Sequence, residues 1–139
     1  MASNLVSNGD FENGTANWSF TNQGSGVADE SETITNKYCK ISTTESIYQQ
    51  LAVGSGDKVT VSLSSRGVLS GTISVMLNNS NTSYWSDTFN SEMNSTWTSE
   101  NFSFTVGSDW TGPLVLHFQA AYSATATDVV EVDNIIASK

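Results

Sequence analysis

The sequence predicts an all-β protein folded as a β-sandwich. Apolar residues recur at every second position along much of the chain, which is the period of a half-buried strand. Turn-forming residues separate these runs at short intervals, and no segment shows a convincing helical period. Short strands at this spacing are typical of a sandwich of two sheets. A length of 139 residues fits one domain that is large enough to fold without a stabilising disulfide or metal ion.

Four segments alternate clearly, and weaker runs complete the expected set of about eight to ten strands. The clear runs are 58–64, 72–78, 101–106 and 114–119, and the weaker ones are 4–7, 17–21, 37–42, 46–53 and 129–137. Turn signals lie at 8–10, 13–14, 54–57, 78–81 and 107–108. The polar, glycine-containing stretch 22–36 is expected to be a loop.

The composition favours a neutral, hydroxyl-rich partner. The 14 acidic and 5 basic residues give a formal charge of −9, which argues against a nucleic-acid ligand. Ser, Thr and Asn together supply 52 residues, so hydroxyls and amides dominate the surface chemistry. The single Cys excludes an internal disulfide framework and any multi-cysteine metal site. No apolar run has the length of a membrane span, so no membrane partner is expected.

The chain is expected to be one monomeric module of a longer, bacterial-type extracellular protein. Its first three residues, Met1, Ala2 and Ser3, resemble an expression scar. Residues 4–139 then form a single domain, because neither an internal repeat nor a domain boundary is visible.

Alternation also predicts which side chains point outward. If the apolar residues of each strand face the core, polar and planar side chains line one outer sheet face. Such side chains suit sugar recognition, because sugar hydroxyls accept and donate paired hydrogen bonds and a pyranose ring packs on an aromatic face. The expected members of this face are Tyr48, Gln50, Arg66, His117 and Gln119. The alternative for Arg66 is a structural role, in which it pairs with a carboxylate and stabilises the sheet.

Several segments together resemble a known family. The opening run 4–14 with Trp18, the segments 48–51, 64–66, 96–105 and 116–118, and the closing run 130–135 resemble the carbohydrate-binding modules of the related families 4, 9, 16 and 22. The resemblance covers the whole chain. It implies a jelly-roll β-sandwich of two antiparallel sheets. It also implies a non-catalytic role, in which the module holds a linked glycoside hydrolase on its polysaccharide.

The same resemblance implies a structural calcium ion. Its implied ligands are the carboxylates of Glu12 and Asp133, backbone carbonyls near Asp10 and Lys37, and a further acidic residue for which Glu32 is the nearest candidate. The alternative is that Glu12 caps a turn and Asp133 is a solvated strand carboxylate.

The resemblance also implies a sugar site along one sheet. His117, in the segment Leu116-His117-Phe118, stands where family members have a sugar-contacting His, and either Tyr84 or Trp85 stands where they have a stacking aromatic. The remaining implied contacts are Arg66, Tyr48, Gln50, Gln119 and Tyr122. Trp85 lies in a polar context and is expected to be an exposed platform. Trp18, Trp97 and Phe20 are expected in the core, Cys39 is expected to be a buried inert thiol, and Trp110 is left open.

Two non-catalytic functions therefore compete. The first is binding to internal stretches of a β-linked plant polysaccharide, with xylan first and β-glucan, glucomannan or mannan as alternatives. The second is a structural or adhesive sandwich of a surface protein without a sugar site. Catalysis is disfavoured, because a glycosidase needs two opposed carboxylates and the expected outer face has none. One open groove shared by the row Tyr48, Gln50, Arg66, Trp85 and His117 favours the first function. A buried Trp85 together with a covered face favours the second.

Overall fold

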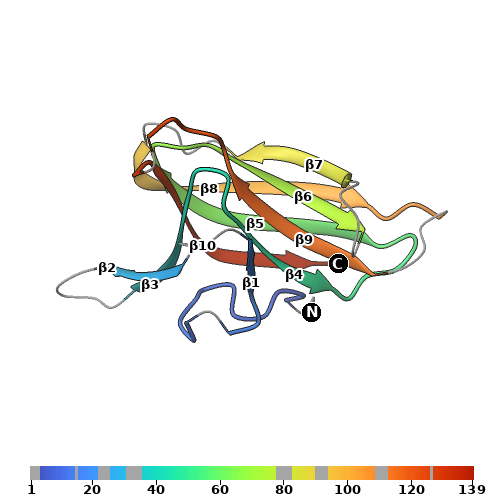
Figure 1. The fold of residues 1–139 in the computed structure, drawn as a ribbon. Helices are drawn as coiled ribbons and strands as arrows, with labels where there is room; N and C mark the ends of the chain where they lie inside the picture. The colour runs from blue at the N-terminus through green and yellow to red at the C-terminus, as the bar shows by residue number, and fades with distance from the viewer. Residues whose placement is uncertain are drawn as a thin grey trace.

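The computed structural model describes residues 4–14, 16–21, 26–30, 36–77, 83–89, 94–108, 113–125 and 127–139. In this part of the chain, ten strands form two antiparallel sheets that pack face to face (Figure 1). Sheet I has the order β1 (Ser19–Thr21), β4 (Ser46–Leu51), β9 (Leu114–Ala120), β6 (Gly71–Leu77) and β7 (Ser83–Phe89). Sheet II has the order β2 (Gly26–Glu30), β3 (Asn36–Ser42), β10 (Val129–Ser138), β5 (Lys58–Gly67) and β8 (Asn94–Thr105). Among the described residues, no helix is long and apolar enough to cross a membrane.

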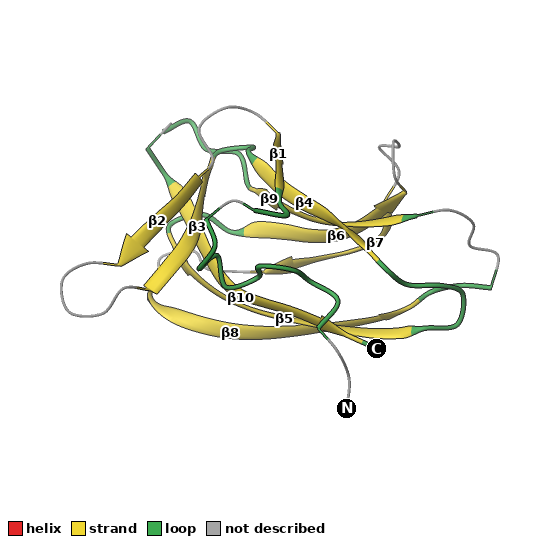
Figure 2. Ribbon diagram, turned by 90° about the horizontal axis from the view of Figure 1, so that it is seen from below, coloured by secondary structure: helices red, strands yellow, loops and turns green. Residues whose placement is uncertain are grey.

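The expected jelly-roll sandwich of two antiparallel sheets is confirmed. Figure 2 shows β8, β5 and β10 along one side of the molecule and β4, β6 and β7 along the other, while the β2–β3 pair projects past one end. The clearly alternating runs all form strands. Three expectations are wrong: the expected loop 22–36 contains β2, residues 4–7 form bends instead of a strand, and β8 begins well before residue 101.

The core lies between the sheets and is built from the apolar positions of each strand. Val59, Val61 and Leu63 of β5 are at most 1% exposed, and Leu116 and Phe118 of β9 are fully buried. Each of these residues alternates with a more exposed neighbour, as the period of two predicts. The expected burial of Trp18 and Cys39 is confirmed, and Phe20 packs partly buried against the core.

The opening segment runs along β10 where β3 no longer pairs with it. β3 pairs with residues 129–132 of β10, and beyond that point the Leu5 amide donates to the Ala137 carbonyl at 2.6 Å. The Ile135 amide donates to the Gly9 carbonyl at 2.9 Å. A Cβ atom on Gly9 would lie 2.0 Å from the Ile135 carbonyl oxygen, so only glycine permits this approach. The two ends of the described chain are thereby joined.

Asn8 fixes the turn that follows. Its side-chain amide donates to the carbonyls of Gly14 and Ala16, and its Oδ1 accepts from the Asn13 amide. Asn8 has a positive φ of 53°, a conformation that Asn tolerates better than most residues. The Asn8 carbonyl also accepts from the buried Trp18 indole at 2.9 Å. The opening sequence thus encodes a turn that anchors a core residue.

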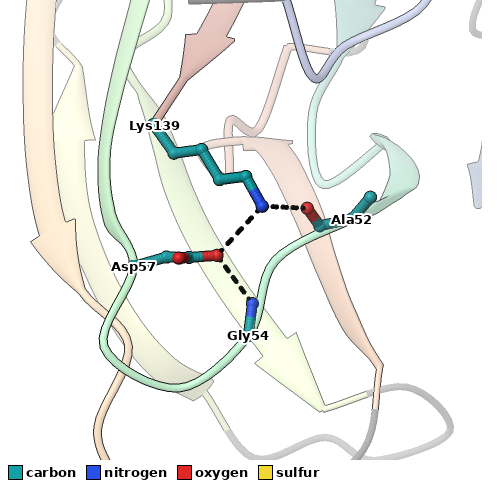
Figure 3. Close-up of polar contacts among 4 residues, drawn as sticks. All are labelled: Ala52, Gly54, Asp57 and Lys139. Carbon is teal, nitrogen blue, oxygen red and sulfur yellow. Dashed lines mark hydrogen bonds and ion pairs between the residues drawn. The ribbon is translucent and has the colours of Figure 1, made fainter.

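A polar clip ties the end of β10 to the loop between β4 and β5. The Asp57 carboxylate accepts from the Gly54 amide at 2.9 Å and from the Lys139 ammonium at 3.2 Å (Figure 3). Lys139 also donates to the Ala52 carbonyl at 3.5 Å. The Gly54 hydrogen bond and the Lys139 charge lower the pKa of the Asp57 carboxyl.

Candidate carbohydrate-binding face

One line of side chains crosses all five strands on the outer face of sheet I. Tyr48 of β4 lies opposite His117 of β9, and His117 lies opposite Ser74 of β6. The line continues to Ser19 of β1 on one side and Ser86 of β7 on the other. Directly opposed residues of antiparallel strands share a face, so these five side chains form a continuous polar row.

Tyr48 and His117 form the centre of this row. Their rings stack with centroids 6.1 Å apart and planes inclined by 25°, and both side chains are partly buried. Burial lowers the pKa of His117, because the low-dielectric surroundings disfavour the charged ring. The imidazole is therefore neutral at neutral pH, with one nitrogen that donates and one that accepts. A neutral stacked pair of this kind offers both an apolar surface and hydrogen bonds.

A second row lies beside the first. Gln119 of β9 is opposite Ser46 of β4 and Thr72 of β6, and Thr72 is opposite Thr88 of β7. The Gln119 side-chain amide donates to the Thr44 carbonyl at 3.3 Å, which orients its oxygen. Gln50 is exposed on the other side of the Tyr48 row, opposite Val115. These positions add amides and hydroxyls on both sides of the stacked pair.

The described outer face of sheet I carries no carboxylate. Its members are Ser19, Ser46, Tyr48, Gln50, Thr72, Ser74, Met76, Ser86, Thr88, Val115, His117 and Gln119. This neutrality contrasts with the formal charge of −9 of the whole chain. Thr72, Ser74, Ser86 and Thr88 were not among the residues that the sequence predicted for this face. The alternation of Thr72 with Ile73 was the available signal for the β6 residues.

Gln49 explains why the phase of β4 was difficult to predict. Ile47 and Leu51 point into the core, and Gln49 shares their side of the strand. Its amide is satisfied by one residue of the opening segment, because it donates to the Ser7 carbonyl at 3.0 Å and accepts from the Ser7 amide at 2.9 Å. A polar inward position is stable here because a backbone partner is supplied.

Arg66 does not join the row. It lies in β5 of sheet II, opposite Glu131 of β10, and its Nε donates to the Glu131 carboxylate at 2.7 Å. Its guanidinium lies 4.4 Å from the Trp97 ring centroid and 5.2 Å from that of Tyr38. The expectation that Arg66 shares a face with Tyr48 is therefore wrong, and the alternative brace through a carboxylate is what the structure contains. Trp97, expected in the core, is instead partly buried beside Arg66.

Trp85 and Tyr84 also lie away from the outer row. Trp85 is opposite Val75, a core residue, and it stacks on Phe104 at 5.2 Å and 24°. It is partly buried, which corrects the expectation of an exposed platform. The Tyr84 hydroxyl donates to the Thr105 carbonyl at 2.9 Å and accepts from the Gly107 amide. Both aromatics therefore contact sheet II.

Tyr122 is the most exposed of the expected contacts. It follows β9 beyond Gln119, and 79% of its surface is exposed. The neighbouring Ala121 amide donates to the Ser70 carbonyl at 3.0 Å and fixes the local backbone. Trp110, which the sequence left open, lies outside the described residues.

The expected calcium ligands come together in part. The Glu12 carboxylate accepts from the Lys37 amide at 2.8 Å, so the opening loop and the start of β3 meet. Asp133 is 1% exposed at the bulge of β10, and Asp10 is exposed. Glu32 lies outside the described residues. No group of three or more His, Cys, Asp or Glu side chains suited to a metal is found in the described part of the chain, so a calcium ion here would need carbonyl ligands as well.

The fold and the neutral polar face together define a carbohydrate-binding β-sandwich. The sequence model of a family described as "Carbohydrate binding domain" matches residues 3–125, and the chain belongs to this family. The resemblance noted from the sequence is thereby confirmed. No curated protein sequence shows significant similarity to this chain.

Solved structures of binding modules share the fold. One is described as "CBM4 structure and function", with a TM-score of 0.75, 18% identity and coverage of 96% of this chain and 98% of that one. A second is the CBM22-2 xylan-binding domain from Paenibacillus barcinonensis Xyn10C, with a TM-score of 0.65, 18% identity and coverage of 94% and 96%. A third is TmCBM61 in complex with β-1,4-galactotriose, with a TM-score of 0.71, 14% identity and coverage of 97% of both chains. At these identities the likeness concerns the fold alone.

Proposed function

We propose that the outer face of sheet I binds internal stretches of a neutral β-linked plant polysaccharide, with xylan as the first candidate. The observation that carries the proposal is the stacked pair of Tyr48 and His117 at the centre of a carboxylate-free polar face. The row crosses five strands and its end residues, Ser19 and Ser86, are exposed, although Ser74 within it is buried. Exposed ends favour a chain lying across the sheet over a chain end held in a pocket. The xylan-binding CBM22-2 neighbour supports xylan as the first choice.

Binding is shared among several weak contacts. A sugar ring packs against the Tyr48–His117 surface, while Gln50, Gln119 and Thr72 exchange hydrogen bonds with its hydroxyls. One stacked ring contributes only about 1 kcal/mol beyond its buried area. Micromolar affinity requires about 8 kcal/mol. Several rings must therefore bind at once, with Tyr122 available to contact a ring beyond Gln119.

We further propose that the module is non-catalytic and that it carries a linked glycoside hydrolase to the polysaccharide substrate of that enzyme. A glycosidase needs a pair of opposed carboxylates, and the described outer positions of sheet I offer neither Asp nor Glu. The hydroxyl- and amide-rich composition supports secretion of the parent protein and its action outside a bacterial-type cell. The module is proposed to work as a monomer.

A structural calcium ion belongs to the same proposal. Glu12 and Asp133, with carbonyls near Asp10 and Lys37, would hold it between the opening loop and β10. The bound ion would supply charge neutralisation and a cross-link between distant segments. Thermal unfolding in excess EDTA and in excess calcium tests this role. A melting temperature that rises with calcium in the wild type but not in Glu12→Gln supports it, and equal melting temperatures contradict it.

Isothermal titration with oligosaccharides tests the sugar site. Xylohexaose, cellohexaose, mannohexaose and a galacto-oligosaccharide are compared on the wild type, on Tyr48→Ala and on His117→Ala. We expect xylohexaose to bind most tightly and each variant to lose about tenfold or more in affinity, which is about 1.4 kcal/mol. Ser64→Ala, on the outer face of sheet II, is the matched control and should bind normally.

Each outcome of that titration has a distinct meaning. Preference for another oligosaccharide would overturn xylan while keeping the module class. Normal binding by both variants would place the site elsewhere. Heat from none of the ligands, with a folded sample, would favour a structural or adhesive sandwich.

A further inference from the structure

A hollow lies at the edge of the sandwich, away from the Tyr48 row. β7 is an edge strand of sheet I, β8 is an edge strand of sheet II, and the two contact each other (Figure 1). The hollow between them has a volume of about 620 Å³, a size typical of small-molecule sites. Its lining residues are Lys58, Tyr84, Trp85, Ser103, Phe104 and Thr105.

The aromatic wall of this hollow is held in place. Trp85 stacks on Phe104 and meets the edge of Phe102 at 6.3 Å, so its ring is fixed against the core. The Tyr84 hydroxyl bonds to the backbone of Thr105 and Gly107, which fixes the second ring. A preformed wall loses little conformational entropy when a ligand binds.

The rest of the lining is polar, carries a positive charge and comes from outward positions of sheet II. Lys58 is exposed and lies opposite Thr105 in the β5–β8 register, and the Ser103 hydroxyl lies 3.3 Å from that of Thr60. Two of the other basic residues form ion pairs within the protein: Arg66 pairs with Glu131, and Lys139 pairs with Asp57. Among the described residues, no carboxylate lies within ion-pair distance of the Lys58 ammonium.

We propose that this hollow binds a single sugar unit that carries a carboxylate, such as a uronic acid. The sugar ring packs on Trp85, its hydroxyls meet those of Ser103 and Thr105, and its carboxylate pairs with Lys58. The site is independent of the neutral outer face of sheet I, and its ligand would be an acidic branch or end.

The negative net charge of the chain does not prevent this binding. Repulsion from distant carboxylates is screened beyond about 8 Å at physiological salt. The Lys58–carboxylate contact is local and exposed, so it is screened less than the distant charges but still weakens as salt rises. The site therefore predicts an affinity for the acidic sugar that falls with ionic strength.

Titration of the labelled full chain by NMR tests the proposal. Methyl β-glucuronide and methyl β-glucoside share a ring and differ in the carboxylate. We expect the glucuronide to shift the Trp85 indole signal and to bind about two- to fivefold more tightly than the glucoside, the gain that an exposed ion pair supplies. Lys58→Gln should remove this preference, while Lys40→Gln, another exposed lysine of sheet II, should keep it.

Three results would overturn the proposal. They are an unmoved Trp85 signal with both sugars, equal affinity for the two sugars, and equal losses in Lys58→Gln and Lys40→Gln. His117→Ala should leave the glucuronide titration unchanged, so this test separates the hollow from the outer face of sheet I. Because both lysines are exposed, neither substitution endangers folding.

Discussion

At the scale of single residues, His117 links stability to pH. Burial lowers the pKa of His117 in the folded protein relative to the ordinary value of 6.5. The unfolded chain therefore binds a proton more readily, and the folded state loses stability as the pH falls below about 6.5. Thermal melting between pH 8 and pH 5 should show this loss in the wild type, with a smaller loss in His117→Gln.

The two melting series distinguish His117 from the acidic residues. Carboxylates titrate in both proteins, so only the difference between the series reports the imidazole. Parallel curves for the wild type and His117→Gln across this pH range would show that His117 titrates normally.

Cys39 gives a second residue-scale prediction. It is fully buried, and burial together with the charge of Glu45 raises the pKa of its thiol to about 12. The reactive thiolate is therefore scarce and shielded at neutral pH. A thiol reagent should not label the native protein within minutes, and labelling should be complete in guanidinium. Fast labelling of the native protein would contradict this burial.

Sequence alternation predicted the outward side chains of β4 and β9 correctly, but it did not predict which sheet a strand joins. Alternation placed Tyr48, Gln50, His117 and Gln119 on outward positions, and the register confirms these placements. Alternation reports the side of a strand but does not say which of two sheets the strand joins. Arg66 points outward as expected, yet it does so from sheet II. The sequence did not predict that Trp85 of β7 points inward, because the residues around it are polar and show no apolar alternation.

At the scale of elements, the contact between the opening segment and β10 depends on Gly9. A Cβ at this position would meet the Ile135 carbonyl at 2.0 Å, so Gly9→Ala forces the two segments apart. We expect a loss of about 1–3 kcal/mol in unfolding free energy, the usual cost of overpacking. Chemical denaturation measures it.

Gly54→Ala is the matched control for that substitution. Nothing lies within 4 Å of a Cβ built on Gly54, so its unfolding free energy should change little. A Gly9→Ala protein as stable as Gly54→Ala would show that the opening segment does not hold β10.

Two edge strands, β2 and β7, were the hardest elements to predict, whereas clear alternation had predicted part of a third edge strand, β8. β2 and β7 each have only one paired side, and neither sequence shows a clean apolar alternation. In β7 the position between the inward residues Trp85 and Phe89 on the same side is Asp87, which interrupts the apolar alternation. The central strands β9 and β5 bury a full inner face, and the sequence predicted both.

At the scale of the whole molecule, the two sheets carry different kinds of side chain on their outer faces. The outer face of sheet I is neutral, while the outer face of sheet II carries the Arg66–Glu131 pair beside Trp97. In the part of the chain that the structure describes, the outer positions of sheet I hold no carboxylate, although the whole chain has a formal charge of −9. A neutral ligand avoids electrostatic repulsion on that face, and a rigid core of two packed sheets holds the five-strand row in one geometry.

The extent of that row predicts how affinity depends on ligand length. Each additional ring that reaches the face contributes about 1 kcal/mol, which is about fivefold in affinity. Xylohexaose should therefore bind at least about tenfold more tightly than xylobiose, with the gain ending once the row from Ser19 to Ser86 is covered. Titration of the series from xylobiose to xylohexaose measures this gain. Equal affinity across the series would mean that a pocket holds one chain end, and an open face could not then be the site.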